Sequence, residues 1–108
     1  MAYNKELAYR IRPHLEPFSE FIEEKKMFGG LSFMYKGKMS VGIVKDDLMV
    51  RVVTDKFEKV LAEPHVQPMK FTGKAMKNFV QVLPGGLEVD SQLSRWVDLG
   101  IEHAESQQ

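Results

Sequence analysis

The sequence between residues 27 and 53 constrains the fold most, because three apolar segments follow one another there with very short connections. Within each segment apolar side chains alternate with polar or small ones, which predicts strands buried on one face. The alternating rows are Leu31, Phe33 and Tyr35; Met39, Val41 and Ile43; and Leu48, Val50 and Val52. We therefore predict an antiparallel meander over about residues 31–53.

The lengths of the connections fix the register of this meander. Keeping Tyr35 and Met39 on one face needs an odd number of linking residues, so residues 36–38 are predicted to form a three-residue turn. The next connection has to be even, so either four residues or a tighter pair separates Ile43 from Leu48. A shift of one residue would turn every apolar side chain to the opposite face.

Apolar residues at helical spacing predict three helices. They lie near residues 4–13, 54–62 and 91–104. In the last of them Trp96 shares a face with Leu93 and Ile101, so we expect Trp96 to be buried against the sheet.

Prolines make the segment after the first helix ambiguous. Pro13 and Pro17 break or kink that helix, so residues 14–22 either continue as a short helix or enter a strand. We favour an extended segment from about Ile22 into Met27. Two further strands are predicted at residues 68–71 and 78–83.

The composition fits one globular domain over residues 1–108, with 44% hydrophobic and 10% aromatic residues. No apolar run approaches the roughly 18 residues of a membrane span. The chain has no cysteine, and its first residues are charged where a signal peptide would need an apolar core. We therefore expect a cytoplasmic protein, and its length suits a single two-layer core.

The net charge is zero, but the charges are unevenly distributed. Five lysines and no acid lie between Glu24 and Asp46, whereas the last helix is mostly acidic. The lysines either steer an anionic partner or protect a sheet edge, and we favour the second. Domains that bind nucleic acid are usually basic overall, so specific nucleic-acid binding is not expected.

Two sequence blocks, residues 27–53 and 68–77, carry a family resemblance. Their distinctive residues are Met27, Phe28, Gly29, Gly30, Gly42, Arg51, Pro68, Met69, Phe71, Gly73 and Lys74. With these residues the whole chain resembles the N-terminal domain of the TfoX/Sxy family, which is known for bacterial regulators of natural competence. The resemblance implies an α+β fold in the order α-β-β-β-α-β-β-α, similar to secretion chaperones. Full-length regulators carry a second, helical domain, and we expect none in residues 1–108.

The residues themselves show no catalytic motif, so we expect no cofactor and no metal site. The three histidines, His14, His65 and His103, lie in separate segments. The segment Thr72-Gly73-Lys74 invites comparison with a phosphate loop. A structural turn is favoured, because Ala75 replaces the hydroxyl residue and Pro68 stands where the upstream glycine is expected. Two function classes remain. The favoured one, implied by the resemblance, is a non-enzymatic regulatory or protein-interaction domain; the alternative is a small enzyme or ligand-binding protein with a site around Arg51, Lys74 and His65.

The expected partner is another protein or a second copy of the chain. Met34 and Met49 project from the strand face opposite the main apolar rows. They either form an exposed patch that binds a partner or are covered within the chain. In the first case we expect a homodimer, or a regulatory complex with another protein, through that face, with Arg51 at its polar margin. Arg51 itself is expected to reach an acid or a carbonyl oxygen at the sheet edge.

Overall fold

The computed structural model describes residues 3–27, 29–71 and 74–108, and for residues 27, 70–71 and 74–77 it describes the backbone alone. The helices are α1 (Lys5–Leu15), α2 (Thr54–Leu61) and α3 (Asp90–Ser106), with short 3-10 turns η1 (Glu16–Phe21) and η2 (Pro84–Gly86). The strands are β1 (Ile22–Met27), β2 (Gly30–Tyr35), β3 (Lys38–Val44), β4 (Asp47–Arg51), β5 (Val66–Phe71) and β6 (Lys74–Val82). The three helices lie where the sequence predicts them.

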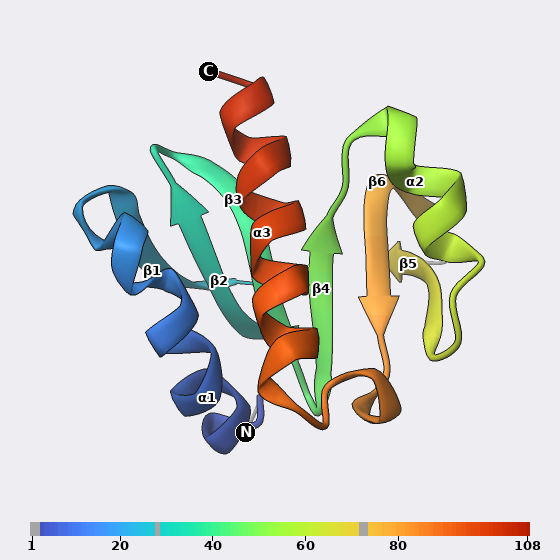
Figure 1. Cartoon of the computed structure of the whole chain (residues 1–108), viewed down its shortest axis with the longest axis horizontal. Coiled ribbons are helices and arrows are strands. Elements are labelled where there is room, and N and C mark those ends of the chain that lie inside the picture. The colour runs from blue at the N-terminus through green and yellow to red at the C-terminus, as the bar shows by residue number, and fades with distance from the viewer. Residues whose placement is uncertain (1–2, 28, 72–73) are drawn as a thin grey trace.

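All six strands form one antiparallel sheet in the order β1-β2-β3-β4-β6-β5. Helices α1 and α3 lie together on one face of the sheet, and α2 packs beside β5 and β6 (Figure 1). The α+β class and the two-layer arrangement are therefore confirmed. The favoured extended segment at Ile22–Met27 is strand β1, which adds one strand to the order implied by the family resemblance. No helix in the described part of the chain is long and apolar enough to cross a membrane.

The main core lies between the sheet and the helices α1 and α3. The predicted rows of β2 and β4 point into it, and Phe33, Val50 and Val52 are fully buried there. Trp96 of α3 is 4% exposed, and its indole N–H donates to the carbonyl oxygen of Gly86 at 2.9 Å. The prediction that Trp96 is buried against the sheet is confirmed.

The three-residue turn predicted at residues 36–38 is wrong. Tyr35 pairs with Lys38, so the turn has two residues, both with positive φ. The register then shifts by one residue, because Ser40 is an extra residue between the Met34–Met39 and Phe33–Val41 pairs. The Ser40 hydroxyl donates to the Phe33 carbonyl oxygen at 2.8 Å, which stabilises this bulge. In contrast, Ile43 does pair with Leu48, across a tight two-residue turn.

The bulge turns Met39 to the opposite face of the sheet, contrary to the prediction that it joins Val41 and Ile43. A second cluster, the methionine cluster, forms on that face from Met39, Met49, Met69 and Phe79. Met49 is only 1% exposed, so the second of the two alternatives left open by the sequence, coverage within the chain, holds for Met49, and the interface hypothesised through this face loses its centre. Met34 is half-buried at the margin of the cluster.

Candidate functional site

Strand β1 forms one outer edge of the sheet. The carbonyl oxygen of Phe21, the residue before β1, accepts a hydrogen bond from the Lys36 N–H at 2.9 Å. With the strand register, this bond determines which residues of β1 direct their backbone N–H and C=O groups toward β2. Because antiparallel hydrogen bonds alternate along a strand, Glu23 and Lys25 bond to β2, while Glu24 and Lys26 direct their N–H and C=O groups outward. In the described part of the chain no strand pairs with this outer side, and the side chains of residues 23–26 are exposed. We call this outer side of β1 the open edge.

The start of the open edge is partly occupied from within the chain. The N–H of Ile22 donates to the Ser19 carbonyl oxygen at the end of η1. The Ile22 carbonyl oxygen remains directed outward. The open edge therefore offers the carbonyl groups of three alternate residues and the N–H groups of Glu24 and Lys26.

The opposite edge of the sheet, β5, is different. The Leu83 N–H donates to the His65 carbonyl oxygen at 2.8 Å, and this register directs the backbone nitrogen of Pro68 outward. Proline has no N–H, so it is tolerated at this position and offers no donor to another strand. Pro68, a residue of the family motif, thus blocks the β5 edge, while the β1 edge stays open.

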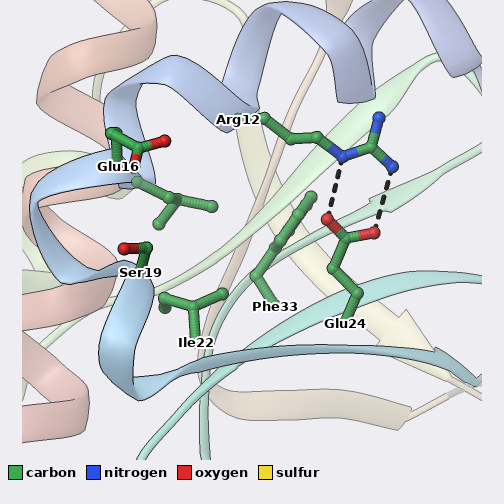
Figure 2. A pocket seen from close by; sticks show the side chains of 7 residues that line it. Arg12, Glu16, Ser19, Ile22, Glu24 and Phe33 are labelled. Atoms are coloured by element: carbon green, nitrogen blue, oxygen red, sulfur yellow. Dashed lines mark hydrogen bonds and ion pairs between the residues drawn. The ribbon is translucent and has the colours of Figure 1, made fainter.

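A hollow of about 230 Å³ lies beside the open edge, between α1, η1 and the sheet. It is lined by Arg12, Leu15, Glu16, Ser19, Ile22, Glu24 and Phe33. Figure 2 shows the guanidinium of Arg12 pointing at the carboxylate of Glu24, with hydrogen bonds of 2.8 and 3.0 Å to its two oxygens. These bonds hold the pKa of Glu24 below its usual value, although partial burial opposes the shift. The lining of the hollow therefore combines the buried apolar side chains of Leu15 and Phe33 with the Arg12–Glu24 ion pair.

Aromatic side chains gather at the start of the open edge. The rings of Phe18 and Phe21 both meet Tyr35 edge-on, at centroid distances of 6.0 and 5.7 Å. Phe21 remains 42% exposed, and the Lys36 ammonium lies 4.5 Å from the centre of its ring. An exposed aromatic side chain beside unpaired backbone groups is typical of protein-binding surfaces.

A second hollow, of about 670 Å³, opens between the end of β4 and the end of α3. Its lining residues are Arg51, Val53, Thr54, Asp55, Asn78, Glu102, His103, Ser106 and Gln107. The guanidinium of Arg51 lies 5.1 Å from the ring centre of Phe79. The expectation that Arg51 reaches an acid or a carbonyl oxygen is wrong within the described residues, where Arg51 makes no hydrogen bond to either and its Nε is buried without a partner.

His103 lines the same hollow and is 4% exposed. Its Nδ1 atom has no hydrogen-bond partner among the described residues. Burial lowers the pKa of His103, and the positive charge of Arg51 lowers it further. His103 therefore favours its neutral form in the folded protein. Because the hollow also contains acids, its charge selects for no single class of ligand.

The alternative site around Arg51, Lys74 and His65 is not assembled as predicted. Arg51 pairs with Phe79 at one end of β4, whereas His65 bonds to Leu83 beyond the other end. His65 lines a separate hollow with Gly85, Gly86 and Trp96. The side chain of Lys74 lies outside the described residues, as does the Thr72-Gly73 part of the compared phosphate loop.

Several family-motif residues have structural roles. Gly29 has a φ of +74°, and a Cβ on Gly30 would lie 2.0 Å from the carbonyl oxygen of Ile43, so both positions need glycine. A Cβ on Gly42 would meet the methyl groups of Met49 and Met39 at 2.9 and 3.0 Å. Met69 belongs to the methionine cluster. Phe28 and the side chains of Met27 and Phe71 lie outside the described residues.

Metal ligands do not gather in the described part of the chain, where no three His, Cys, Asp or Glu side chains lie close enough together to hold an ion. The Arg12–Glu24 pair was missed by sequence reasoning, since no local spacing connects a helix residue with a strand residue twelve positions away. The blocked edge had a usable signal, because proline within a predicted strand indicates an edge.

Comparison with known families gives one result. The family model described as the TfoX N-terminal domain matches residues 13–104. The search of the curated proteins found no significant match, and neither did the search of the solved structures.

Proposed function

Because this chain belongs to the TfoX N-terminal domain family, we propose that it is a regulatory domain that acts by binding protein and catalyses no reaction. The process we propose is the one the family is known for, the control of competence genes. The observation that carries the proposal is the difference between the two sheet edges. The β5 edge is blocked by Pro68, and the β1 edge presents backbone groups that no other described strand pairs with.

The open edge suits the addition of a strand from another protein. In this binding mode, main-chain hydrogen bonds supply affinity and pockets for alternate side chains supply specificity. Glu24 and Lys26 offer the backbone groups, and the hollow beside Glu24 offers a pocket with an apolar floor. The exposed ring of Phe21 extends the apolar contact at the start of the strand.

The ionisable groups of this surface support binding over catalysis. A general base needs a carboxylate free to take a proton from a substrate. Both oxygens of Glu24 already accept hydrogen bonds from Arg12, and the low pKa of Glu24 makes it a weaker base. Arg12 fixes the orientation of the Glu24 side chain and neutralises its charge, which suits a surface that binds a protein.

Two substitutions at one position test the proposal. Lys26→Pro removes an outward N–H without breaking a bond to β2, whereas Lys26→Ala removes the side chain and keeps the N–H. Proteins captured from the native cell by the wild-type chain should be identified, purified and titrated against all three forms. We expect Lys26→Ala to bind such a partner nearly as well as the wild type and Lys26→Pro to lose at least about tenfold in affinity. Equal binding by the proline variant would contradict the proposed surface.

A further inference from the structure

We propose that the open edge pairs with the same edge of a second copy of this chain, in an antiparallel dimer whose twofold axis passes between the two Glu24 residues. This inference rests on the proposed function, since it names one partner for the same surface. It follows from the direction of the backbone groups, the order of charges along β1 and the position of Arg12.

The backbone groups of two copies match in this register. A twofold axis at Glu24 places each Glu24 opposite its equivalent, and their outward N–H and C=O groups can form two hydrogen bonds. It also places Lys26 opposite Ile22 of the second copy, so that each Lys26 N–H meets an outward Ile22 carbonyl oxygen. The two copies would therefore share about four backbone hydrogen bonds.

The charges on one face of the strand are complementary in the same register. Glu23 lies opposite Lys25 of the second copy, and the symmetry repeats this pair. Neither residue is part of a backbone-bonded pair across the interface, so their side chains approach closely. Glu23, Glu24, Lys25 and Lys26 are all exposed in the single chain, and no ion pair between described residues involves Glu23 or Lys25.

The other face brings the two Glu24 carboxylates together, which would normally oppose pairing. Each carboxylate, however, accepts two hydrogen bonds from Arg12 of its own chain. The arginines thus neutralise the only like-charged pair that is directly opposed in this register. In this dimer the Arg12–Glu24 ion pair would reduce the repulsion between the two Glu24 carboxylates.

Neighbouring registers lack this compensation. A shift by two residues in one direction preserves about four backbone bonds and places Glu24 opposite Lys26 of the second copy, but Glu24 is already neutralised by Arg12. This shift also places Lys25 directly against its equivalent in a closely spaced pair, where repulsion is strongest. The opposite shift places Glu23 against its equivalent and loses backbone bonds, because the Ile22 N–H is already used by Ser19. Charge therefore selects the register centred on Glu24.

Edge strands usually avoid self-pairing by carrying charges of one sign, often lysines, which repel each other. The order Glu23-Glu24-Lys25-Lys26 has both signs and complements itself when it runs antiparallel. The β5 edge, with Pro68 directed outward, cannot pair in this way. A dimer through β1 would also bring the two Glu24-lined hollows together across the axis, so that a third protein would meet one continuous groove.

Sedimentation equilibrium between about 1 and 500 µM tests the dimer, with charge variants to identify the interface. Lys25→Glu places acids against Glu23 of the second copy, and we expect at least about a tenfold weaker dimer. The charge exchange Glu23→Lys with Lys25→Glu rebuilds both pairs and should restore the dissociation constant to within about threefold of the wild type. Lys59→Glu, the same change on exposed α2, should have no effect. Circular dichroism and thermal unfolding at low concentration check that each variant is folded.

Two outcomes would overturn this inference. One is a monomer up to about 500 µM. The other is a dimer that Lys25→Glu leaves unchanged or that the charge exchange does not restore. A monomeric chain whose open edge still binds another protein in a Lys26-dependent manner would remove the dimer and leave the proposed function in place.

Discussion

The close contact between α3 and β3 gives the sharpest prediction about stability. Gly100 lies in α3 directly over the bulged part of β3. A Cβ at this position would lie 2.6 Å from the Ser40 carbonyl oxygen and 2.7 Å from a methyl group of Val41. The oxygen belongs to the backbone, so it cannot rotate away as a side chain could. Gly100→Ala therefore forces the helix and the sheet apart.

Two effects of Gly100→Ala oppose each other. Replacing glycine by alanine in a helix normally stabilises it by about 1 kcal/mol. Moving the carbonyl contact from 2.6 Å to an ordinary 3.4 Å separates α3 from the sheet and loosens the packing around Trp96. Overpacking of this kind costs about 1–3 kcal/mol, and contact with a rigid backbone puts the cost near the upper end. We expect a net loss of about 1–2 kcal/mol, which corresponds to a decrease in Tm of about 4–9 °C for a chain of this size.

Urea denaturation followed by Trp96 fluorescence measures this loss as a change in the free energy of unfolding. Asp98→Ala is the matched control, because Asp98 is exposed on the same helix and its replacement changes only helix propensity. If Gly100→Ala is as stable as the wild type or is stabilised like Asp98→Ala, then α3 does not pack on β3 as described.

Three further predictions concern Trp96, His103 and the distribution of charge. Trp96→Ala should cost about 3–5 kcal/mol, measured by urea denaturation with circular dichroism, and an unchanged midpoint would show that α3 is peripheral. Because the fold lowers the pKa of His103, the folded protein binds fewer protons than the unfolded chain below about pH 6.5, so stability should decrease as the pH falls through that range. His103→Gln should remove this slope, and an unaltered slope would contradict the burial of the imidazole. Nucleic-acid binding by the chain should be weak and non-specific in fluorescence anisotropy at about 150 mM salt, and sub-micromolar sequence-selective binding would refute the argument from charge.

The register of the sheet shows which structural features the sequence pattern predicts and which it does not. The alternation of side chains correctly predicted the faces of Val41 and Ile43 but misplaced Met39. A two-residue turn followed by a one-residue bulge has the same parity as a three-residue turn, so the two differ only between the turn and Ser40. The alternation pattern cannot distinguish them, because the bulge depends on a hydrogen bond from Ser40 to the neighbouring strand.

The candidate site was less predictable for a similar reason. Which strands lie at the edges depends on pairings between distant segments, above all the insertion of β6 between β4 and β5. The proline within β5 is typical of an edge strand, whereas the lysines that we interpreted as edge protection are spread over residues 25–45 and do not single out Ile22–Met27 as the other edge. The ion pair of Arg12 and Glu24 depends on how α1 crosses the sheet, and the burial of Met49 depends on contacts from β5 and β6.

Amide hydrogen exchange along β1, resolved residue by residue by NMR, tests the central claim most directly. In the free single chain the amides of Glu23 and Lys25 should exchange slowly, because they bond to β2, and those of Glu24 and Lys26 should exchange quickly. When a protein partner or a second copy binds the open edge, the amides of Glu24 and Lys26 should become protected as well. Fast exchange at Glu24 and Lys26 in the presence of a saturating partner, or at protein concentrations where the chain is dimeric, would contradict binding through this edge.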